Sequence, residues 1–222
     1  MLTKKEKTFS IVFFIILIIE LICGSTDSLL QLHYITKPSI VLSLLVFFWM
    51  ESRSILKSIR NLTLLALGFS LLGDVFLMFV DHSPKYFMFG LVAFLLAHIM
   101  YILVFLKHRN PKKRPLLFLV FLLIYASGLF LLLKNGLGEM LVPVLIYMLV
   151  ILAMAMTTFL REGKVSKTNY AFVTLGAILF LVSDSLLAIN KFYESFEIAN
   201  ILIMLTYGLA QYFIVFGIKN SS

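Results

Sequence analysis

The sequence predicts an all-α, polytopic membrane protein: a bundle of eight transmembrane helices with both termini on the cytoplasmic side. The first observation is composition, because 61% of the 222 residues are hydrophobic, only 14% are charged, and the mean hydropathy is +1.04. Soluble globular domains carry about 25% charged residues, so a soluble protein is excluded. The other two observations are the number of long apolar runs and the side on which the basic residues fall.

Eight apolar runs approach or reach the roughly 20 residues that a helix needs to cross a bilayer. Charged or Pro- and Gly-containing breaks separate them. The expected helices are 9–24, 36–50, 61–80, 86–107, 115–134, 140–160, 169–189 and 197–217. The breaks are too short to hold a soluble domain, so residues 1–222 are expected to form a single transmembrane domain.

The first run, 9–24, follows Lys4, Lys5 and Lys7 and in this respect resembles a signal peptide. Glu20 interrupts its end, and the residues up to Cys23 form a poor lipoprotein site. Cleavage would also leave an odd number of helices, so we expect the run to stay as the first helix. None of the runs has the in/out alternation of barrel strands, so helices are expected throughout.

The basic residues set the orientation, because cytoplasmic loops collect Lys and Arg. With a cytoplasmic N-terminus, the outside segments hold only Lys37, Lys85, Lys134 and Lys191. The inside segments hold the others: Lys4, Lys5, Lys7, Arg53, Lys57, Arg60, Lys107, Arg109, Lys112, Lys113, Arg114, Arg161, Lys164, Lys167 and Lys219. The net charge of +8 is therefore attributed to membrane orientation, and no nucleic-acid partner is expected.

Two aspartates lie inside apolar runs, where a charged group costs at least about 2.5–3.5 kcal/mol. Asp74 lies in the run 61–80 and Asp184 in the run 169–189, and each follows a small residue, Gly73 or Ser183. At ~1.5 Å per residue, both carboxylates are expected about 8–9 Å below the outer surface. Buried ionisable residues are functional candidates by default, so we expect this pair to act together, with Ser183 in support. Ser70, one turn before Asp74, is expected to be a packing residue.

Polar residues on the run after each aspartate point to the same region. His98 and Tyr101 are three residues apart, and Tyr207 and Gln211 are four apart, so each pair shares one helix face. The matching positions suggest a repeat of four plus four helices. An expected cavity, open to the outside, is completed by residues near the outer helix ends: Glu20, Lys37 and Asn190. For each of them, and above all for His98, hydrogen bonding between helices is the structural alternative.

The sequence implies no metal and no other cofactor. Cys23 is the single cysteine, and of the four histidines only His98 lies deep inside a run. A zinc-dependent membrane amidase would need a cluster of histidines and is therefore disfavoured.

Five short pieces occur in a recognisable order over most of the chain: Lys37-Pro38, Phe69 to Asp74, Gly90 to His98 with Tyr101, Val182 to Ser185 continuing to Asn190, and Tyr207 with Gln211. With them, the chain resembles the YhhN-like family of integral membrane lysoplasmalogenases. The resemblance implies an eight-helix hydrolase of the vinyl ether bond of lysoplasmalogens. It would release a fatty aldehyde and a glycerophospho-alcohol, either glycerophosphoethanolamine or glycerophosphocholine. The implied partners are a lysophospholipid substrate and the lipid bilayer.

The chemistry of this reaction suits paired carboxylates. A vinyl ether is cleaved by protonation of its β-carbon, formation of an oxocarbenium ion and addition of water, which together need an acid and an anion. Glycosidases divide these roles between two carboxyl groups. We therefore expect Asp74 and Asp184 to be the catalytic pair, with the acid undecided. Lys37 is the expected phosphate partner, and supporting roles fall to His98, Tyr101, Tyr207 and Gln211.

A proton-coupled carrier of a lipid or small amphiphile is the alternative, because buried aspartates also form proton relays and internal repeats are common in carriers. A receptor or a purely structural membrane protein stays open as well. The short loops suggest a bacterial cytoplasmic (inner) membrane, with the cavity nearer the outer face, and an intracellular membrane of a larger cell is the other option. Headgroup preference and oligomeric state are left open.

Overall fold

The computed structural model describes residues 3–220, and every regular element in that part of the chain is helical. Eight long helices follow one another: α1 (Lys4–Cys23), α2 (Leu30–Glu51), α3 (Lys57–Leu77), α4 (Pro84–Leu106), α5 (Leu116–Leu133), α6 (Leu141–Phe159), α7 (Lys167–Phe192) and α8 (Ala199–Lys219). Short 3₁₀ turns, Asp27–Leu29 and Gly138–Met140, lead into α2 and α6. The predicted all-α class is confirmed.

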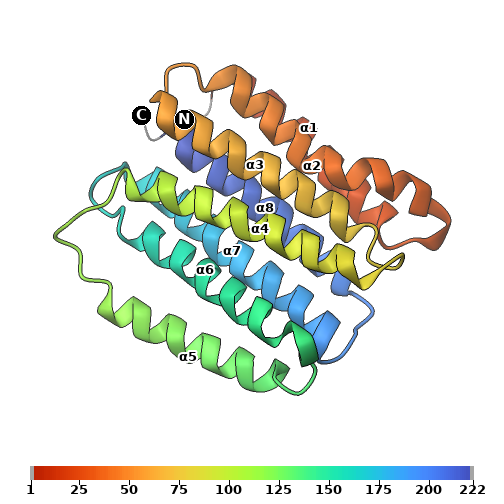
Figure 1. The fold of residues 1–222 in the computed structure, drawn as a ribbon. Coiled ribbons are helices and arrows are strands. Elements are labelled where there is room, and N and C mark those ends of the chain that lie inside the picture. Colours follow the sequence, from red (N-terminus) through yellow and green to blue (C-terminus); the bar gives the residue numbers. More distant parts are fainter. Residues whose placement is uncertain (1–2, 221–222) are drawn as a thin grey trace.

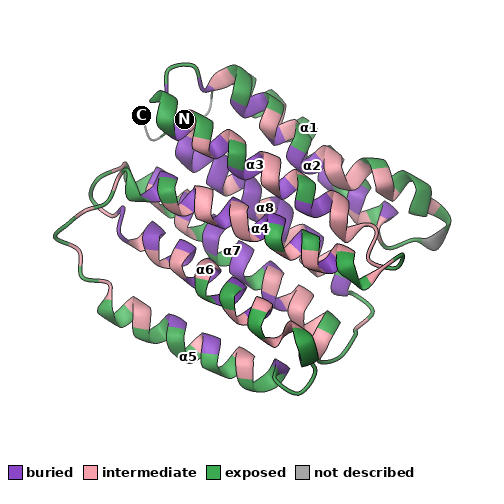
Figure 2. Ribbon diagram, in the orientation of Figure 1, coloured by how far each residue is buried: buried purple, intermediate pink, exposed green. Residues whose placement is uncertain are grey.

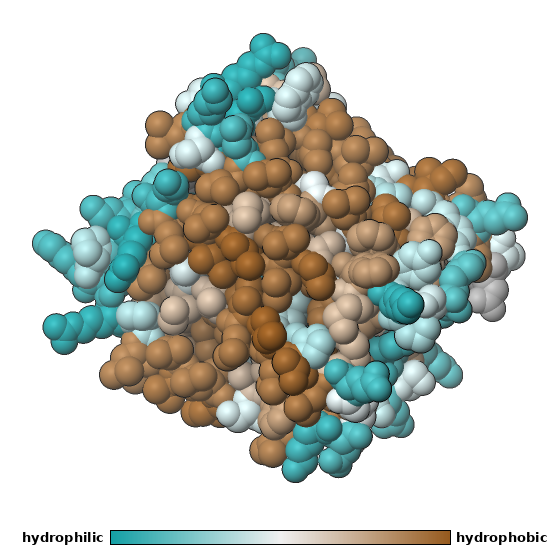
Figure 3. Space-filling model, in the orientation of Figure 1, coloured by the Kyte–Doolittle hydropathy of each residue, from teal (hydrophilic) through white to brown (hydrophobic). Residues whose placement is uncertain are grey.

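Seven of these helices, α2 to α8, are long and apolar enough to cross a membrane. The remaining helix, α1, carries more charge: Lys4, Lys5, Glu6, Lys7 and Glu20. All eight helices run between the same two ends of the bundle (Figure 1), and a broad apolar region separates the polar residues at those ends (Figure 3). This distribution is that of an integral membrane protein, as the composition predicts.

Helix α8 lies in the core of the bundle, where it packs along α7 and also contacts α1 and α2 (Figure 2). Two glycines allow the close approach of α7 and α8. A Cβ on Gly176 would lie 2.8 Å from the carbonyl oxygen of Ala210, and one on Gly217 would lie 3.1 Å from the carbonyl oxygen of Asn169. The two backbones are therefore nearly in contact, which fixes the position of the polar side chains that α7 and α8 carry.

Helix α5 lies at the edge of the bundle (Figure 1), and most of its surface is exposed (Figure 2). Leu117, Phe121 and Ile124 are 87%, 63% and 68% exposed, as expected for side chains that face lipid. It contacts α6 and α7. Helix α5 thus covers one side of α6 and α7 without belonging to the core.

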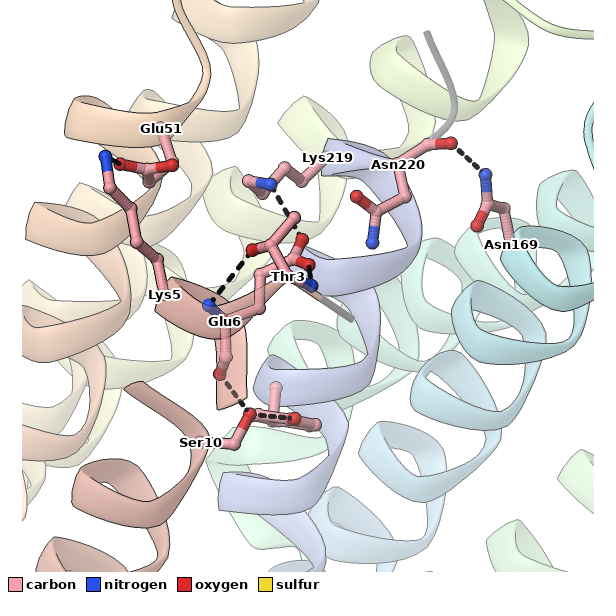
Figure 4. Close-up of polar contacts among 9 residues, drawn as sticks. Thr3, Lys5, Glu6, Ser10, Glu51, Asn169, Lys219 and Asn220 are labelled. Carbon is pink, nitrogen blue, oxygen red and sulfur yellow. Dashed lines mark hydrogen bonds and ion pairs between the residues drawn. The ribbon is translucent and has the colours of Figure 1, made fainter. Parts of the chain in front are cut away.

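Both ends of the described chain lie at the same end of the bundle (Figure 1), as an even number of crossings requires. Thr3 caps α1 and forms a capping box with Glu6. Glu6 also pairs with Lys219, whose Nζ lies 2.7 Å from its Oε1, and Lys5 pairs with Glu51 at 3.3 Å (Figure 4). These contacts join α1 to α8 and α2.

Helix α2 begins at Leu30, earlier than the start predicted at residue 36. Its Pro38, next to Lys37, lies inside the helix and removes one backbone hydrogen bond there. The turn before the proline is held from outside, because the Thr36 hydroxyl donates to Glu20 of α1 at 2.5 Å. This contact between helices, which the sequence pattern does not reveal, joins the turn before the proline to α1.

Candidate active site

Asp74, near the end of α3, lies in a buried hydrogen-bonded cluster with α8 and α4. Its Oδ2 accepts a hydrogen bond from the Tyr207 hydroxyl at 2.8 Å, and the residue is only 2% exposed. Beside it, the Gln211 amide donates to Ser70 at 2.9 Å and accepts from the Tyr101 hydroxyl at 2.7 Å. The structure thus brings together four predicted residues, and it adds Ser70 as a hydrogen-bond partner rather than as a packing residue alone.

Asp184 lies on α7 in a second cluster, formed with α6 and α4. Its Oδ2 accepts a hydrogen bond from the Tyr147 hydroxyl at 2.5 Å. Nε2 of His98 lies 3.9 Å from the same oxygen. His98 is fully buried, and neither of its ring nitrogens makes a hydrogen bond with any residue between 3 and 220. An ordered water is the usual partner of a buried polar group that lacks one in the protein.

Aromatic rings connect the two clusters. The Phe180 ring lies 4.6 Å from the His98 ring and 5.4 Å from the Tyr207 ring, measured between centroids. Phe94 packs against α3 beside Asp74, where a Cβ on Gly73 would come within 2.6 Å of its ring. The two carboxyl clusters are therefore joined by a shared aromatic wall.

Charged residues of α1 and α2 lie near the Asp74 cluster. The positive charge of Lys37 acts on both Asp74 and Glu20. Glu20 is fully buried, and its oxygens are contacted by the Thr36 hydroxyl and by Nδ1 of His33, which lies 2.9 Å away. Lys37 thus supplies a counter-charge to two carboxylates, a feature that the Asp184 cluster lacks.

Two apolar cavities meet at Asp184. The first lies between α3, α4, α6 and α7, and the second lies between α5, α6 and α7. Both are lined by Val144, Tyr147, Asp184 and Ala188. Asp74 lines neither of them. The two aspartates, which look equivalent in the sequence, therefore differ in access.

Ser183 and Asn190, also predicted as supporting residues, bond to backbone atoms. The Ser183 hydroxyl donates to the carbonyl of Ile203 at 3.0 Å, and Asn190 accepts from the backbone N–H of Phe196 at 3.3 Å. Both contacts hold α7 against α8 and the segment before it. The sequence predicts the same depth for both aspartates. Asp74 lies close to the end of α3 at Leu77, whereas α7 continues well beyond Asp184 to Phe192, so the two residues differ in their distance from the helix end.

Sequence reasoning missed Tyr147, His33 and Thr36 as partners of the predicted carboxyl groups. Tyr147 is the single tyrosine in the otherwise apolar run 140–160. A buried tyrosine hydroxyl usually finds a partner, so this isolated position was the available signal. His33 gave no comparable signal because it precedes the predicted start of its helix at residue 36, and Thr36 gave none because a threonine at a helix start is ordinary. Among the described residues, no group of three or more His, Cys, Asp or Glu side chains is arranged to hold a metal ion.

The fold and the site together define a class: a helical integral membrane protein with one buried and one partly buried carboxyl group inside its helices, the second of which borders two apolar cavities. The sequence profile of the YhhN family matches residues 32–218, and the chain belongs to this family. The match includes Asp74, Asp184 and the tyrosine, histidine and glutamine that surround them.

Several curated relatives are similar over most of this chain. The lysoplasmalogenase TMEM86B of Homo sapiens is 32% identical over 183 residues, which are 82% of this chain and 73% of that protein. The lysoplasmalogenase TMEM86B of Mus musculus is 32% identical over 177 residues, 79% of this chain and 70% of that protein. The lysoplasmalogenase TMEM86A of Bos taurus is 32% identical over 161 residues, which are 70% of this chain and 64% of that protein. No solved structure matches this chain.

Proposed function

We propose that this protein is a membrane lysoplasmalogenase, which hydrolyses the vinyl ether bond of a lysophospholipid. The products would be a fatty aldehyde and glycerophosphoethanolamine or glycerophosphocholine. The observation that carries the proposal is the carboxyl group of Asp184, held by Tyr147 at the point where two apolar cavities meet. The names of the relatives in human and mouse support the substrate class.

Asp184 is the proposed acid, because it is the aspartate that borders the space a lipid would occupy. Tyr147 fixes one carboxyl oxygen at 2.5 Å, which leaves the other oxygen to carry the proton. In the first step this proton forms the new C–H bond at the β-carbon of the vinyl ether. The electron pair of the C=C bond forms this C–H bond, a lone pair of the ether oxygen forms the new C=O⁺ bond, and an oxocarbenium ion results.

Water completes the reaction. It adds to the oxocarbenium carbon and returns one proton to the Asp184 carboxylate, which gives a hemiacetal. Asp184 then gives its proton to the glycerol oxygen as the bond between that oxygen and the hemiacetal carbon breaks, the hemiacetal hydroxyl gives its proton back to Asp184, and the aldehyde leaves. We assign His98 to position this water, because its Nε2 lies 3.9 Å from Asp184 Oδ2 without forming a hydrogen bond to it.

Asp74 is the proposed anion of the pair. A negative charge near the oxocarbenium ion stabilises the transition state that leads to it. Tyr207 holds Asp74 by a hydrogen bond, and Lys37 supplies the counter-charge that a carboxylate in the membrane needs. Gln211 and Tyr101 position Tyr207 through the buried hydrogen-bond chain. Ser183, Asn190 and Glu20 act as positioning residues further from the reaction.

The proposed location is a bacterial cytoplasmic membrane, with the cavities nearer the outer face. The predicted distribution of Lys and Arg supports this orientation. The substrate would enter from the outer leaflet with its headgroup at the end of the bundle where α7 ends.

The test is aldehyde release from a lysoplasmalogen by the full chain purified in detergent. The ester-linked lysolipid is the substrate control, and Asp184→Asn is compared with Asp81→Asn, whose residue is exposed and lines neither cavity. We expect aldehyde only from the vinyl ether lipid, lost in Asp184→Asn and kept in Asp81→Asn. Folded wild-type protein that releases no aldehyde refutes the proposal. Gradient-driven uptake of the lipid into vesicles by such protein would then favour the carrier.

A further inference from the structure

Lys191, in the last turn of α7, lies on the same helix face as Asp184. Seven residues separate them, which is two turns and a rise of about 10 Å. Leu187 and Ala188, which lie between them on that face, line the first cavity. The first cavity therefore extends from the Asp184 carboxyl group along α7 toward Lys191.

The Lys191 side chain extends toward α4 at the end of this cavity. Its Nζ lies 5.7 Å from the centroid of the Phe87 ring, and Phe87 lines the cavity. Phe192 packs edge-to-face against the same ring at 5.5 Å. None of the ion pairs among the described side chains includes Lys191. An exposed ammonium group thus lies at the cavity end with its charge available to an anion.

Lys37, which the sequence suggests as the phosphate partner, lies near two carboxyl groups of the protein. The charges of Asp74 and Glu20 both act on it, and it lines neither cavity. A phosphate beside Lys37 would be repelled by these two carboxylates. A phosphate beside Lys191 would meet a compact ammonium group of the kind that binds phosphate elsewhere.

We propose that Lys191 binds the phosphate of the lysophospholipid and that the outer part of the first cavity holds its glycerol. This assignment rests on the proposed function. In a lysoplasmalogen, the three glycerol carbons separate the vinyl ether oxygen from the phosphate. With the vinyl ether at Asp184, the phosphate therefore lies toward Lys191, and the second cavity, beside α5, receives the hydrocarbon chain.

The test compares Lys191→Met with Lys134→Met, a matched control at the end of α5 whose lysine is exposed and lines neither cavity. The two substrates are a lysoplasmalogen and the corresponding 1-alkenylglycerol, which lacks the phosphate. We expect Lys191→Met to raise KM for the lysoplasmalogen about tenfold and to change kcat less than twofold, since a charge that binds both ground and transition state acts on KM. KM for the 1-alkenylglycerol should stay the same in both variants. An unchanged KM for the lysoplasmalogen overturns the assignment.

Two further measurements separate this assignment from the proposed function. Binding of a non-cleavable alkyl ether lysophospholipid needs no turnover, so weaker binding by Lys191→Met supports the phosphate site even if the wild type releases no aldehyde. Equal binding by the wild type and Lys191→Met overturns it. Inhibition by glycerophosphoethanolamine is compared with inhibition by inorganic phosphate. Stronger inhibition by the ester supports a headgroup site, whereas equal inhibition indicates a site for free phosphate and overturns the lipid assignment.

Discussion

Replacing Tyr147 by phenylalanine tests whether the orientation of the Asp184 carboxyl group matters for catalysis. The substitution removes a single oxygen, the hydroxyl that donates to Asp184 Oδ2 at 2.5 Å, and keeps the ring that packs 5.3 Å from His98. Hydrogen bonds to charged groups contribute about 1.5–3 kcal/mol, and the Asp184 carboxyl group becomes charged as it gives up its proton in the transition state. At about 1.4 kcal/mol per factor of ten, this corresponds to a loss in kcat of roughly ten- to a hundredfold.

The assay is steady-state aldehyde release from a lysoplasmalogen in detergent, with thermal unfolding measured on the same samples. Tyr212→Phe is the matched control, because the Tyr212 hydroxyl is also hydrogen bonded, to Ser10 at 2.6 Å, and its residue lines neither cavity. We expect wild-type kcat in Tyr212→Phe. A folded Tyr147→Phe protein with wild-type kcat would refute the role given to this hydrogen bond and would remove the argument that Asp184 is oriented for proton transfer.

Three other predictions concern the second carboxylate, the chain cavity and the terminal ion pair. Asp74→Asn should lower kcat at least a hundredfold while leaving binding of an alkyl ether lysophospholipid within threefold; loss of binding with normal kcat would contradict its role as the anion. Leu129→Trp, which fills part of the second cavity, should raise KM for long alkenyl chains and not for short ones, as seen in a chain-length series. Lys219→Met leaves Glu6 buried without its cation, so it should lower the free energy of unfolding by about 3–5 kcal/mol and shift thermal unfolding down; an unchanged transition would show that the pair does not stabilise the bundle.

The helices could be predicted from the sequence because the membrane leaves the backbone few choices. An apolar run of sufficient length has to satisfy its own hydrogen bonds, and a helix does so. The predicted start of α2 at residue 36 was wrong, because the hydropathy rule does not take contacts between helices into account. Proline interrupts a helix in isolation, yet Thr36 and Glu20 hold the turn before Pro38 through a contact between α1 and α2. Such a contact depends on which helices pack together, and a hydropathy pattern does not contain that information.

The candidate site could be predicted in part for a similar reason. Asp74 and Asp184 stand out in the sequence because a charge in an apolar run is costly and needs a reason. Helical spacing also placed Tyr207 and Gln211 on one face, and both are now found in the same cluster. Tyr147 was missed because tyrosine is compatible with a membrane helix, and only the packing of α6 against α7 brings its hydroxyl to Asp184.

Each aspartate has one polar neighbour from the other half of the chain, where the halves are α1–α4 and α5–α8, while Tyr147 bonds to Asp184 within the second half. Tyr207 of the second half donates to Asp74 of the first half, whereas His98 of the first half lies beside Asp184 of the second. Tyr101 and Gln211 join the same two helices, α4 and α8, by a direct hydrogen bond. Two halves with equivalent polar positions would produce this exchange of partners, and the repeat of four plus four helices stays a prediction.

Asp74 and Asp184 occupy similar positions in the sequence, but the neighbouring helices give them different surroundings. Asp74 has Lys37 of α2 as a counter-charge and no cavity beside it, whereas Asp184 has Tyr147 of α6 and a cavity on each side. Paired carboxyl groups take separate roles as acid and anion when their surroundings differ in this way. The division of labour that vinyl ether hydrolysis needs would therefore arise from two residues on neighbouring helices, Lys37 of α2 and Tyr147 of α6, and replacing either of them is the change that should disturb it most.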